Sequence, residues 1–406
     1  MNPPLERRDF LKLASAGTAA TILPPRPFRP RDVPFFRRKD VFIGGLDSVR
    51  EYRIPGLVTT RKGTLLALCD ARVEKTGDAP NNIDLALKRS LDGGDTWERM
   101  KIVVDFPGHQ AACDPCMLVD RQTGSVWILY DHIWPNLEAL EKENRTLPPG
   151  IQPDAAGRTM LLHAIVSHDE GQTWSKPRDI TEMVTQPVKS SVMAAPGMGI
   201  QMQDGRLLAP CYSDRRKLGK LTGNGYSSVC YSDDHGKTWQ LGGAAAASTN
   251  ECQVVELVDG RLMINMRNFH ESEEGHRAVA TSRDGGKNWS KVSYDGTLIE
   301  PNCQASFIRY TDTRQGSAKS RLLFSNPAHR KERVNMTVRL SYDEGQTWPV
   351  SKVIYPGPSA YSCLTALGDG NIGLLYENGL KGPYEKITFA RFNLEWLTDG
   401  SDSLAS

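Results

Sequence analysis

The sequence repeats one eight-residue phrase five times, and this repeat limits the possible folds more than any other feature. Each copy reads Ser-x-Asp-x-Gly-x-Thr-Trp, with Asn in place of Thr in one copy. The copies begin at Ser90, Ser167, Ser232, Ser282 and Ser341, so their starts are 77, 65, 50 and 59 residues apart. Solenoid repeats keep a short fixed period, whereas irregular spacings of this size are typical of blades joined by loops of variable length.

Each copy of the phrase predicts a tight turn. A central Asp side chain can accept main-chain N–H groups, and the Gly can adopt a positive φ that a Cβ would oppose. Five of the eight Trp residues end these copies, where they can pack back against a sheet. We therefore predict structural rather than catalytic roles for the five aspartates: Asp92, Asp169, Asp234, Asp284 and Asp343.

The segments before the repeats are short and rich in β-forming residues. "IDLALKRS" (83–90), "LLHAIVSH" (161–168) and "MTVRLS" (336–341) each lead into a copy, and apolar and polar residues tend to alternate. Long amphipathic helical patterns are missing. Radial repetition of four-stranded sheets gives a β-propeller. Five repeats in a chain of this length, with one blade lacking a copy, predict an all-β fold with six blades.

Composition excludes several classes of partner. The chain has 406 residues, 39% hydrophobic and 24% charged, and 50 basic against 48 acidic residues give a net charge of +2. These values are ordinary for a globular protein. No polybasic run suggests nucleic acid, and beyond the N-terminus no apolar stretch could span a membrane. Only Cys113 and Cys116 among eight cysteines are close in sequence, which argues against a zinc site.

The N-terminus resembles an export signal. "RRDFLKLASAGTAATIL" (7–23) places paired arginines before a short Ala-rich apolar segment that ends at two prolines. This pattern is similar to a twin-arginine signal, which would send the folded chain to the periplasm or outside the cell. A disordered basic tail, or a signal retained as an anchor, remains open. We expect a signal and linker over 1–35, a propeller over 36–398 and a C-terminal tail over 399–406.

"YRIPGL" (52–57) together with the five repeats resembles the exo-α-sialidase (neuraminidase) family of bacterial type, from about residue 40 to about 395. The resemblance implies a six-bladed propeller that removes terminal α-linked sialic acid from sialylated glycans or glycoproteins with retention of configuration. It implies no metal and no organic cofactor. We further expect a monomer, no nucleic-acid partner and no membrane span in the mature chain.

The resemblance implies three arginines that bind the substrate carboxylate. A sialic acid carries a carboxylate on its anomeric carbon, and planar, permanently charged guanidinium groups suit this anion. The first matches Arg53 in "YRIP", the second Arg267 at the end of "LMINMR", and the third Arg333 in "RVNMTVRL". Arg330 and Arg339 are near the third position, and for Arg339 we expect a solvated surface charge.

The same carboxylate explains the expected nucleophile. A carboxylate nucleophile would be repelled by the anionic sugar, whereas a neutral phenol would not, and sialidases are known exceptions to the two-carboxylate scheme for this reason. By resemblance the nucleophile is Tyr361 in "GPSAYSC", with Glu251 in "NECQ" as its base. Tyr355 and Tyr376 are poorer matches to the family pattern.

By resemblance the general acid is Asp78 in "TGDAPNN", on a loop between two predicted strands. A mobile loop would let one carboxyl group act first as acid and then as base. Its rival, Asp84, lies within the following strand. An Asp before Ala-Pro is also a common turn residue.

Three further residues match supporting positions of the family. Glu377 in "LLYENG" would orient the first arginine, Asp114 in "CDPC" would contact a substrate hydroxyl, and Arg72 in "CDARV" would lie on the substrate rim. The charged, Pro-rich segment 132–160 is either a lid that offers Trp134 to the sugar or a solvated loop.

Three alternatives remain open at this point. Repeats of this kind also occur in non-catalytic carbohydrate-binding propellers, and a fold does not fix a function. A trans-sialidase would share the catalytic residues and differ only in acceptor contacts. A hydrolase of a related acidic 2-keto sugar would use the same arginines, so the identity of the nonulosonic acid is not predicted.

Overall fold

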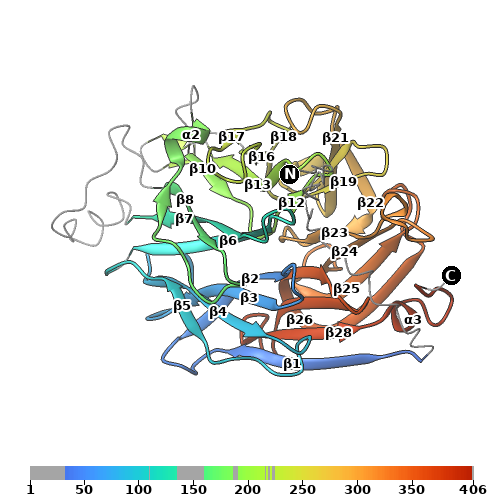
Figure 1. Cartoon of the computed structure of the whole chain (residues 1–406), viewed down its shortest axis with the longest axis horizontal. Helices are drawn as coiled ribbons and strands as arrows, with labels where there is room; N and C mark the ends of the chain where they lie inside the picture. The colour runs from blue at the N-terminus through green and yellow to red at the C-terminus, as the bar shows by residue number, and fades with distance from the viewer. Residues whose placement is uncertain are drawn as a thin grey trace, which may run out of the picture.

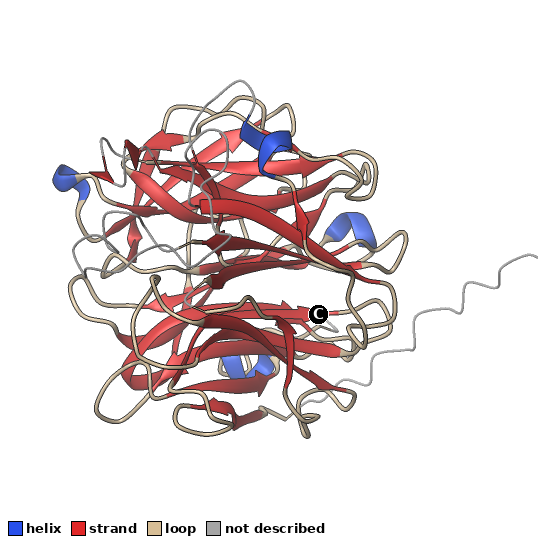
Figure 2. Cartoon of the chain, turned by 90° about the vertical axis from the view of Figure 1, so that its left-hand side faces the viewer, coloured by secondary structure: helices blue, strands red, loops and turns tan. Residues whose placement is uncertain are grey.

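The computed structural model describes residues 33–108, 110–134, 160–185, 191–214, 216–217, 220–221 and 225–404. Strands dominate this part of the chain, and the few helices are short pieces between sheets (Figure 2). The helical elements are α2 (Thr181–Thr185), α3 (Leu394–Leu397) and the 3₁₀ turns η1 (Glu271–Glu273) and η2 (Thr313–Gln315). The predicted all-β class is therefore confirmed.

Consecutive strands form antiparallel meanders. Two meanders form one nine-stranded sheet. A parallel pairing of Ile83 with Ala111 joins one meander to the other. Its strands are β2 (Glu51–Thr59), β3 (Leu65–Arg72), β4 (Ile83–Ser90), β5 (Lys101–Val104), β6 (Ala111–Val119), β7 (Val126–Ile133), β8 (Met160–Ser167), β9 (Arg178–Asp179) and β11 (Gly197–Met198).

The middle of the chain forms two smaller sheets and one short ribbon. The first sheet contains β10 (Ser191–Ala194), β12 (Ile200–Gln201), β13 (Leu207–Asp214), β16 (Tyr226–Ser232), β17 (Gln240–Leu241) and β18 (Ala246–Ala247). The ribbon pairs β14 (Arg216–Lys217) with β15 (Lys220–Leu221). The second sheet contains β19 (Thr249–Glu256), β20 (Leu262–Asn268), β21 (His276–Ser282) and β22 (Ser293–Ile299).

The last sheet joins the two ends of the described chain. It contains β23 (Ser306–Thr311), β24 (Arg321–Pro327), β25 (Val334–Ser341), β26 (Val350–Ala366), β27 (Ile372–Asn378), β28 (Lys386–Phe392) and β1 (Phe36–Ile43). The long β26 pairs with β25 through its first part and with β27 through its second part. Because β1 pairs with β28, the first strand completes the meander formed by the last three.

The inner strands of the meanders, β2, β6, β13, β19, β23 and β26, meet in the middle of the molecule (Figure 1). β2 contacts both β6 and β26, β19 contacts both β13 and β23, and β23 contacts β26. Four of these strands contain a bulge, in β2, β6 and β19 near the beginning of the strand and in β26 where its pairing with β27 begins. A bulge redirects the side chains around it. The register shifts lie between Arg53 and Gly56, Cys113 and Cys116, Thr249 and Cys252, and Ser359 and Ser362.

Neighbouring meanders pack face to face through apolar side chains. One cluster joins Leu57, Leu65 and Cys69 of β2 and β3 to Phe42 of β1 and Phe389 of β28. Each of these five side chains is at most 2% exposed. Burying such side chains is the main favourable term in folding. The core is therefore divided into layers between sheets rather than gathered in one place.

The five repeats form the predicted turns. In the first copy, Ser90 Oγ and the Thr96 main-chain N–H both donate to Asp92 Oδ1, at 2.8 and 2.9 Å. The same bond from the residue four places after the Asp occurs in the other copies. Burial alone would raise the pKa of Asp92, but the hydrogen bonds from Thr96 and Ser90 lower it to about 2.

The glycine and tryptophan of the first copy attach it to the neighbouring sheet. Gly94 has φ 92°, and a Cβ there would lie 2.0 Å from Cε1 of Phe389. Trp97 meets the ring of Phe389 edge-on, with ring centroids 5.4 Å apart. The turn therefore fixes the contact between two meanders and lies far along the strands from their bulged ends.

The structure also bears on the cysteines, the C-terminal segment and the question of membrane-spanning helices. All eight cysteines are buried and free. Asp402, in the predicted C-terminal tail, is buried and accepts a hydrogen bond from Nε of Arg321 at 2.7 Å, so this part of the tail packs against the sheets. Among the described residues, no helix has the length and apolarity needed to cross a bilayer. The signal segment 7–23 lies outside the described residues.

Asp92→Ala should reduce stability without changing chemistry. The substitution removes hydrogen bonds that hold an exposed turn, so we expect a loss of about 1–2 kcal/mol in the free energy of unfolding. Thermal melting and activity per folded molecule are the measurements. Asp95→Ala is the matched control, because the Asp95 side chain in the same turn makes long surface ion pairs, at 3.7 and 3.8 Å, which contribute little to stability. A stable but inactive Asp92→Ala protein would contradict the structural role.

Candidate active site

Six of the predicted residues come together at one rim of the sheets. Antiparallel neighbours run in opposite directions, so the start of a first strand lies beside the end of the second strand. Three of the six lie beside bulges of the inner strands, and three lie at or beside the ends of neighbouring strands. They are Arg53 on β2, Glu251 on β19, Tyr361 on β26, Arg267 on β20, Glu377 on β27 and Arg333 just before β25.

Tyr361 is at the centre of this group. Its hydroxyl donates to Oε1 of Glu251, and Nη1 of Arg267 donates to the Tyr361 oxygen at 3.0 Å. The same Nη1 donates to Oε2 of Glu251 at 2.7 Å. Arg53 and Arg333 lie against the Tyr361 ring, with their Cζ atoms 5.2 and 5.5 Å from its centroid. The structure thus brings all three predicted arginines to one phenol.

Burial and charge have opposite effects on the Tyr361 hydroxyl. The residue is 6% exposed, and burial raises its pKa well above the ordinary value. The negative charge of Glu251 raises this pKa further, whereas Arg267 and Arg333 lower it. The free phenol therefore keeps its proton at neutral pH. Its proton can leave only toward Glu251, which already accepts the hydrogen bond.

Glu377 fixes Arg53 and the main chain on both sides of the centre. Its Oε1 accepts from Arg53 Nε and from the main-chain N–H of Ile54, both at 2.7 Å. Its Oε2 accepts from the main-chain N–H of Tyr361 at 3.0 Å. Glu377 is fully buried, and its charge raises the pKa of Arg53 although burial opposes this. The carboxylate therefore ties β2 and β26 to β27.

Arg333 is held by residues that the sequence analysis did not name. Its Nη1 donates to the Tyr384 hydroxyl at 2.8 Å, and its Nη2 donates to the main-chain oxygen of Asn302 at 3.2 Å. The Tyr384 ring also lies under Arg53, with the guanidinium carbon 3.9 Å from the centroid. Contacts with tyrosine and amide groups hold this guanidinium without neutralising it.

Asp78 lies on an exposed loop, attached to Arg72. Arg72 Nη2 donates to Asp78 Oδ1 at 2.5 Å, and Arg72 Nη1 donates to Glu51 Oε2 at 3.1 Å. The Asp78 side chain is 87% exposed, whereas that of Arg72 is 3% exposed. Glu51 pairs with Arg72 across β2 and β3, two residues before Arg53. Asp78, the predicted acid, is therefore linked through Arg72 and Glu51 to β2, the strand that carries Arg53.

Asp114 belongs to a group of three carboxyl groups beside this loop. Its main-chain N–H donates to Asp70 Oδ1 at 3.2 Å, and Asp131 is fully buried nearby on β7. Burial, followed by the charges of Glu251 and Asp78, raises the pKa of Asp114 to about 7. Burial and the charge of Asp114 also raise the pKa values of Asp70 and Asp131. Protonated carboxyl groups of this kind can donate hydrogen bonds to a substrate.

Several residues at the site were missed by the sequence analysis. Glu51, Asp70, Asn302 and Tyr384 all contact predicted site residues. Glu51 and Asp70 lie opposite Arg72 and Arg53 in the β2–β3 register, so a strand-pairing argument could have found them. Asn302 and Tyr384 lie in turns outside the strands, and no local pattern marked them.

The rival residues make their contacts elsewhere. Asp84 lies in β4, where burial and Asp105 raise its pKa to about 7. The Tyr355 hydroxyl donates to the main-chain oxygen of Gly379 at 2.7 Å, and Tyr376 is fully buried within β27. The expected surface position of Arg339 is wrong, because this residue is buried on β25, where the sheets pack together.

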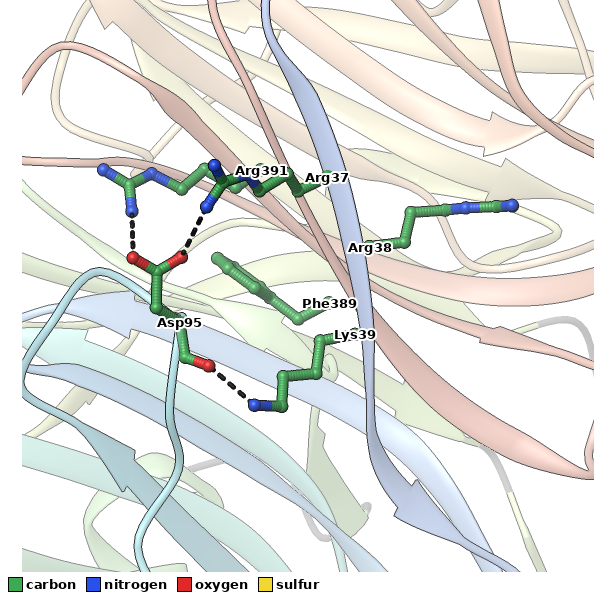
Figure 3. Close-up of a pocket in the computed structure, with 7 residues that line it drawn as sticks. Arg37, Arg38, Lys39, Asp95, Phe389 and Arg391 are labelled. Carbon is green, nitrogen blue, oxygen red and sulfur yellow. Dashed lines mark hydrogen bonds and ion pairs between the residues drawn. The ribbon is translucent and has the colours of Figure 1, made fainter.

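Trp134 and a cavity beside β1 are two further candidates for parts of the site. Trp134 donates its indole N–H to His132 Nδ1 at 3.2 Å, while residues 135–159 of the predicted lid lie outside the described residues. A cavity of about 420 Å³ lies between β1, β28 and the first repeat (Figure 3). Its Arg37, Lys39 and Arg391 surround Asp95 and share no residue with the arginine cluster. Over the described part of the chain, no cluster of His, Cys, Asp and Glu could hold a metal.

Known proteins share both the sequence and the fold. A family model described as a BNR repeat-like domain matches residues 63–374. A sialidase of Micromonospora viridifaciens is 38% identical, covering 97% of this chain and 60% of the relative. Sialidase-2 of Cricetulus griseus is 30% identical, covering 85% of this chain and 92% of the relative. The chain belongs to the sialidase family. The repeats are the BNR repeats of that family.

Other members extend this relationship. A sialidase of Bacteroides fragilis is 36% identical, covering 83% of this chain and 61% of the relative. The chain thus spans about 60% of the length of the two bacterial relatives. The solved structure of the Hadza microbial sialidase Hz136 has a TM-score of 0.77 at 34% identity, over 89% of this chain and 69% of that one. A leech intramolecular trans-sialidase shares the fold, with a TM-score of 0.73 at 22% identity over 90% of this chain and 71% of that one.

Glu377→Gln should lower both the stability and the activity of this sialidase-family protein. The buried Arg53 would lose its charged partner, which should cost about 3 kcal/mol in the free energy of unfolding. Urea unfolding and activity per folded molecule are the measurements. Asp402→Asn is the control, because it disrupts the buried pair with Arg321 outside the site. The control should lose stability and keep its activity, and wild-type behaviour of Glu377→Gln would contradict this account.

Proposed function

We propose that this chain is a retaining exo-α-sialidase that releases terminal α-linked sialic acid from glycoconjugates. One observation carries the proposal: three guanidinium groups surround a phenol whose proton is already directed at a carboxylate. A binding module needs the arginines but has no use for a buried Tyr361–Glu251 pair. The antiparallel meanders that meet through their inner strands support a six-bladed β-propeller as the scaffold.

The arginine cluster supplies the charge that an anionic sugar requires. Arg53, Arg267 and Arg333 contribute three positive charges, and Glu251 and Glu377 contribute two negative charges. One positive charge therefore remains for the substrate carboxylate. Converging guanidinium groups can bind a carboxylate through several charge-assisted hydrogen bonds. The bound anion would lie over Tyr361, which places the anomeric carbon next to the phenol oxygen.

The first step forms a bond between Tyr361 and the sugar. Glu251 removes the phenol proton as the oxygen attacks the anomeric carbon, and Arg267 stabilises the developing phenolate. The glycosidic C–O bond breaks, and Asp78 gives its proton to the departing sugar oxygen. A neutral nucleophile avoids the repulsion that a carboxylate would meet beside the substrate anion.

The second step reverses these proton movements. Asp78, now a carboxylate, takes a proton from water as the water oxygen attacks the anomeric carbon. The bond to Tyr361 breaks, and Glu251 returns the proton to the phenol oxygen. Two displacements at one carbon give net retention of configuration. Every charge in this scheme is supplied by side chains, so we propose that no metal or organic cofactor takes part.

Asp114, which is half-buried, and Arg72 offer contacts to the rest of the sugar. Burial and the charges of Glu251 and Asp78 raise the pKa of Asp114 to about 7. We propose that it bonds a substrate hydroxyl, with Arg72 at the rim. These groups would serve N-acetylneuraminic acid or a related nonulosonic acid alike.

We also propose export by the twin-arginine route and a monomeric enzyme. The paired Arg7 and Arg8 before an apolar segment support export. Eight buried free cysteines suit a chain that folds in a reducing compartment before it is exported. Retention in the cytoplasm of the wild-type chain, and equal export after both arginines are changed to Lys, would each contradict the route.

Tyr361→Phe should nearly abolish turnover and preserve binding. The ring stays in place while the nucleophile is lost, so we expect a fall in kcat of roughly 10³-fold or more. Sugar release is measured on a panel of nonulosonic acid α-glycosides, with NMR of the first-formed anomer and titration of an unsaturated sialic acid analogue. Tyr355→Phe is the matched control and should retain full activity. Full activity of Tyr361→Phe, or an inverted product from the wild type, would overturn the mechanism.

Asp78→Ala should affect substrates according to their leaving group. An acidic phenol departs without a proton, whereas a sugar hydroxyl does not, so we expect a fall of roughly 10²- to 10⁴-fold on sialyl-lactose and a smaller fall on an aryl sialoside. Steady-state kinetics on both substrates is the measurement. Asp84→Asn tests the rival carboxylate and should leave the ratio of the two rates unchanged. An equal loss on both substrates would argue against Asp78 as the acid.

A further inference from the structure

Asn302 connects two of the three arginines. Its side-chain Oδ1 accepts from Arg267 Nε at 2.6 Å, and its main-chain oxygen accepts from Arg333 Nη2 at 3.2 Å. We propose that Asn302 is a positioning residue that sets the separation and orientation of Arg267 and Arg333 for the substrate carboxylate. This inference rests on the proposed function, because it assigns a purpose to the spacing of the two guanidinium groups.

The position of Asn302 repeats that of Glu251. "Glu-Cys-Gln" (251–253) and "Asn-Cys-Gln" (302–304) begin the inner edges of consecutive meanders. The glutamines of both triplets donate to the main-chain oxygen of Pro196, at 3.1 and 3.2 Å, and both cysteines are buried. Asn302 is therefore the counterpart of the predicted base, one meander further along the chain.

The backbone at Asn302 directs its amide toward the arginines. Asn302 has φ 53°, a region that residues with a Cβ seldom adopt and that Asn tolerates better than most. Two other residues at this rim, Ile54 and Asp114, have φ values of 61° and 53°. Strained backbone of this kind persists only where surrounding contacts fix it.

A buried ion pair supplies those contacts. Glu300 and Arg277 are 1% and 0% exposed, and Arg277 Nη1 donates to Glu300 Oε2 at 2.6 Å. Glu300 Oε1 accepts from the main-chain N–H of Asn268, the residue after Arg267, at 2.8 Å. Arg277 Nη1 also donates to the main-chain oxygen of Cys303, the residue after Asn302, at 2.8 Å. The pair thus holds Arg267 and Asn302 in a fixed relation to each other.

A neutral acceptor suits this position better than a carboxylate. Asn302 directs Arg267 through a hydrogen bond and leaves the guanidinium charge unpaired by this contact. An Asp here would add a third negative charge to a cluster that has one positive charge to spare. It would therefore compete with the substrate carboxylate for Arg267 and Arg333. Asn302 therefore orients a guanidinium group without neutralising its charge, whereas Glu251 and Glu377 do both.

The test measures binding of an unsaturated sialic acid analogue and its methyl ester by calorimetry. Asn302→Gly removes the amide yet tolerates the positive φ and keeps the main-chain bond to Arg333. We expect the dissociation constant of the acid to rise about tenfold, as for the loss of one hydrogen bond to a charged group. The methyl ester should bind wild type and variant alike, because it lacks the anion. KM should rise more than kcat falls.

A second variant and a control keep the result interpretable. Asn302→Asp preserves shape and acceptor, and we expect it to weaken binding of the acid at least as much as Asn302→Gly. Asn335→Gly is the matched control, since Asn335 also has positive φ, 63°, and its main-chain oxygen accepts from Thr337. The control should bind the acid like the wild type.

The outcomes separate this inference from the proposed function. Failure of the wild type to bind the acid would refute the proposed function itself. Tight binding by the wild type with unchanged affinity in either folded Asn302 variant would overturn the positioning role. Equal weakening of the acid and the methyl ester would also overturn it, because it would indicate a general structural defect.

Discussion

The structure depends on three buried or half-buried guanidinium groups whose positive charge is compensated only in part. Removing such a cation from water is costly unless charged or polar partners replace the water. Glu377 satisfies Arg53, and Glu251 satisfies Arg267. Arg333 instead bonds to neutral groups, the Tyr384 hydroxyl and the Asn302 main chain. The three guanidinium groups and two carboxylates therefore leave one positive charge, which under the proposed function binds the substrate carboxylate.

The scaffold explains how residues more than 300 positions apart can share these contacts. Each meander brings the start of its first strand and the end of its second strand to the same rim. Because the inner strands contact one another, these ends gather around one centre. The pairing of β1 with β28 joins the N-terminal and C-terminal parts of the described chain. The bond between Arg53 and Glu377 crosses the same junction, so closing the fold and assembling the site are coupled.

The two sides of the site differ in environment, and the difference matches the proposed division of labour. Tyr361 and Glu251 are each 6% exposed, and their positions are fixed by Arg267. Asp78 is exposed on a loop and is held by Arg72. A nucleophile gains from a fixed position, whereas a group that serves first as acid and then as base must exchange protons with the leaving group and with water. Burial, followed by the charges of Glu251 and Asp78, raises the pKa of Asp114 to about 7, so this carboxyl group is influenced by both sides of the site.

The sequence alone predicted the all-β class, the turn role of the five repeats and most of the residues that the structure brings together at one rim. Those features are local or motif-based: a turn is written within eight residues, and the Arg, Tyr, Glu and Asp candidates stand in short recognisable phrases. The tertiary structure decided which neutral groups hold the arginines, and it placed Asn302, Tyr384, Glu51 and Asp70 beside them. It also buried Arg339, which the sequence left at the surface. Burial and pairing across strands depend on which distant segments meet, and no local pattern specifies that.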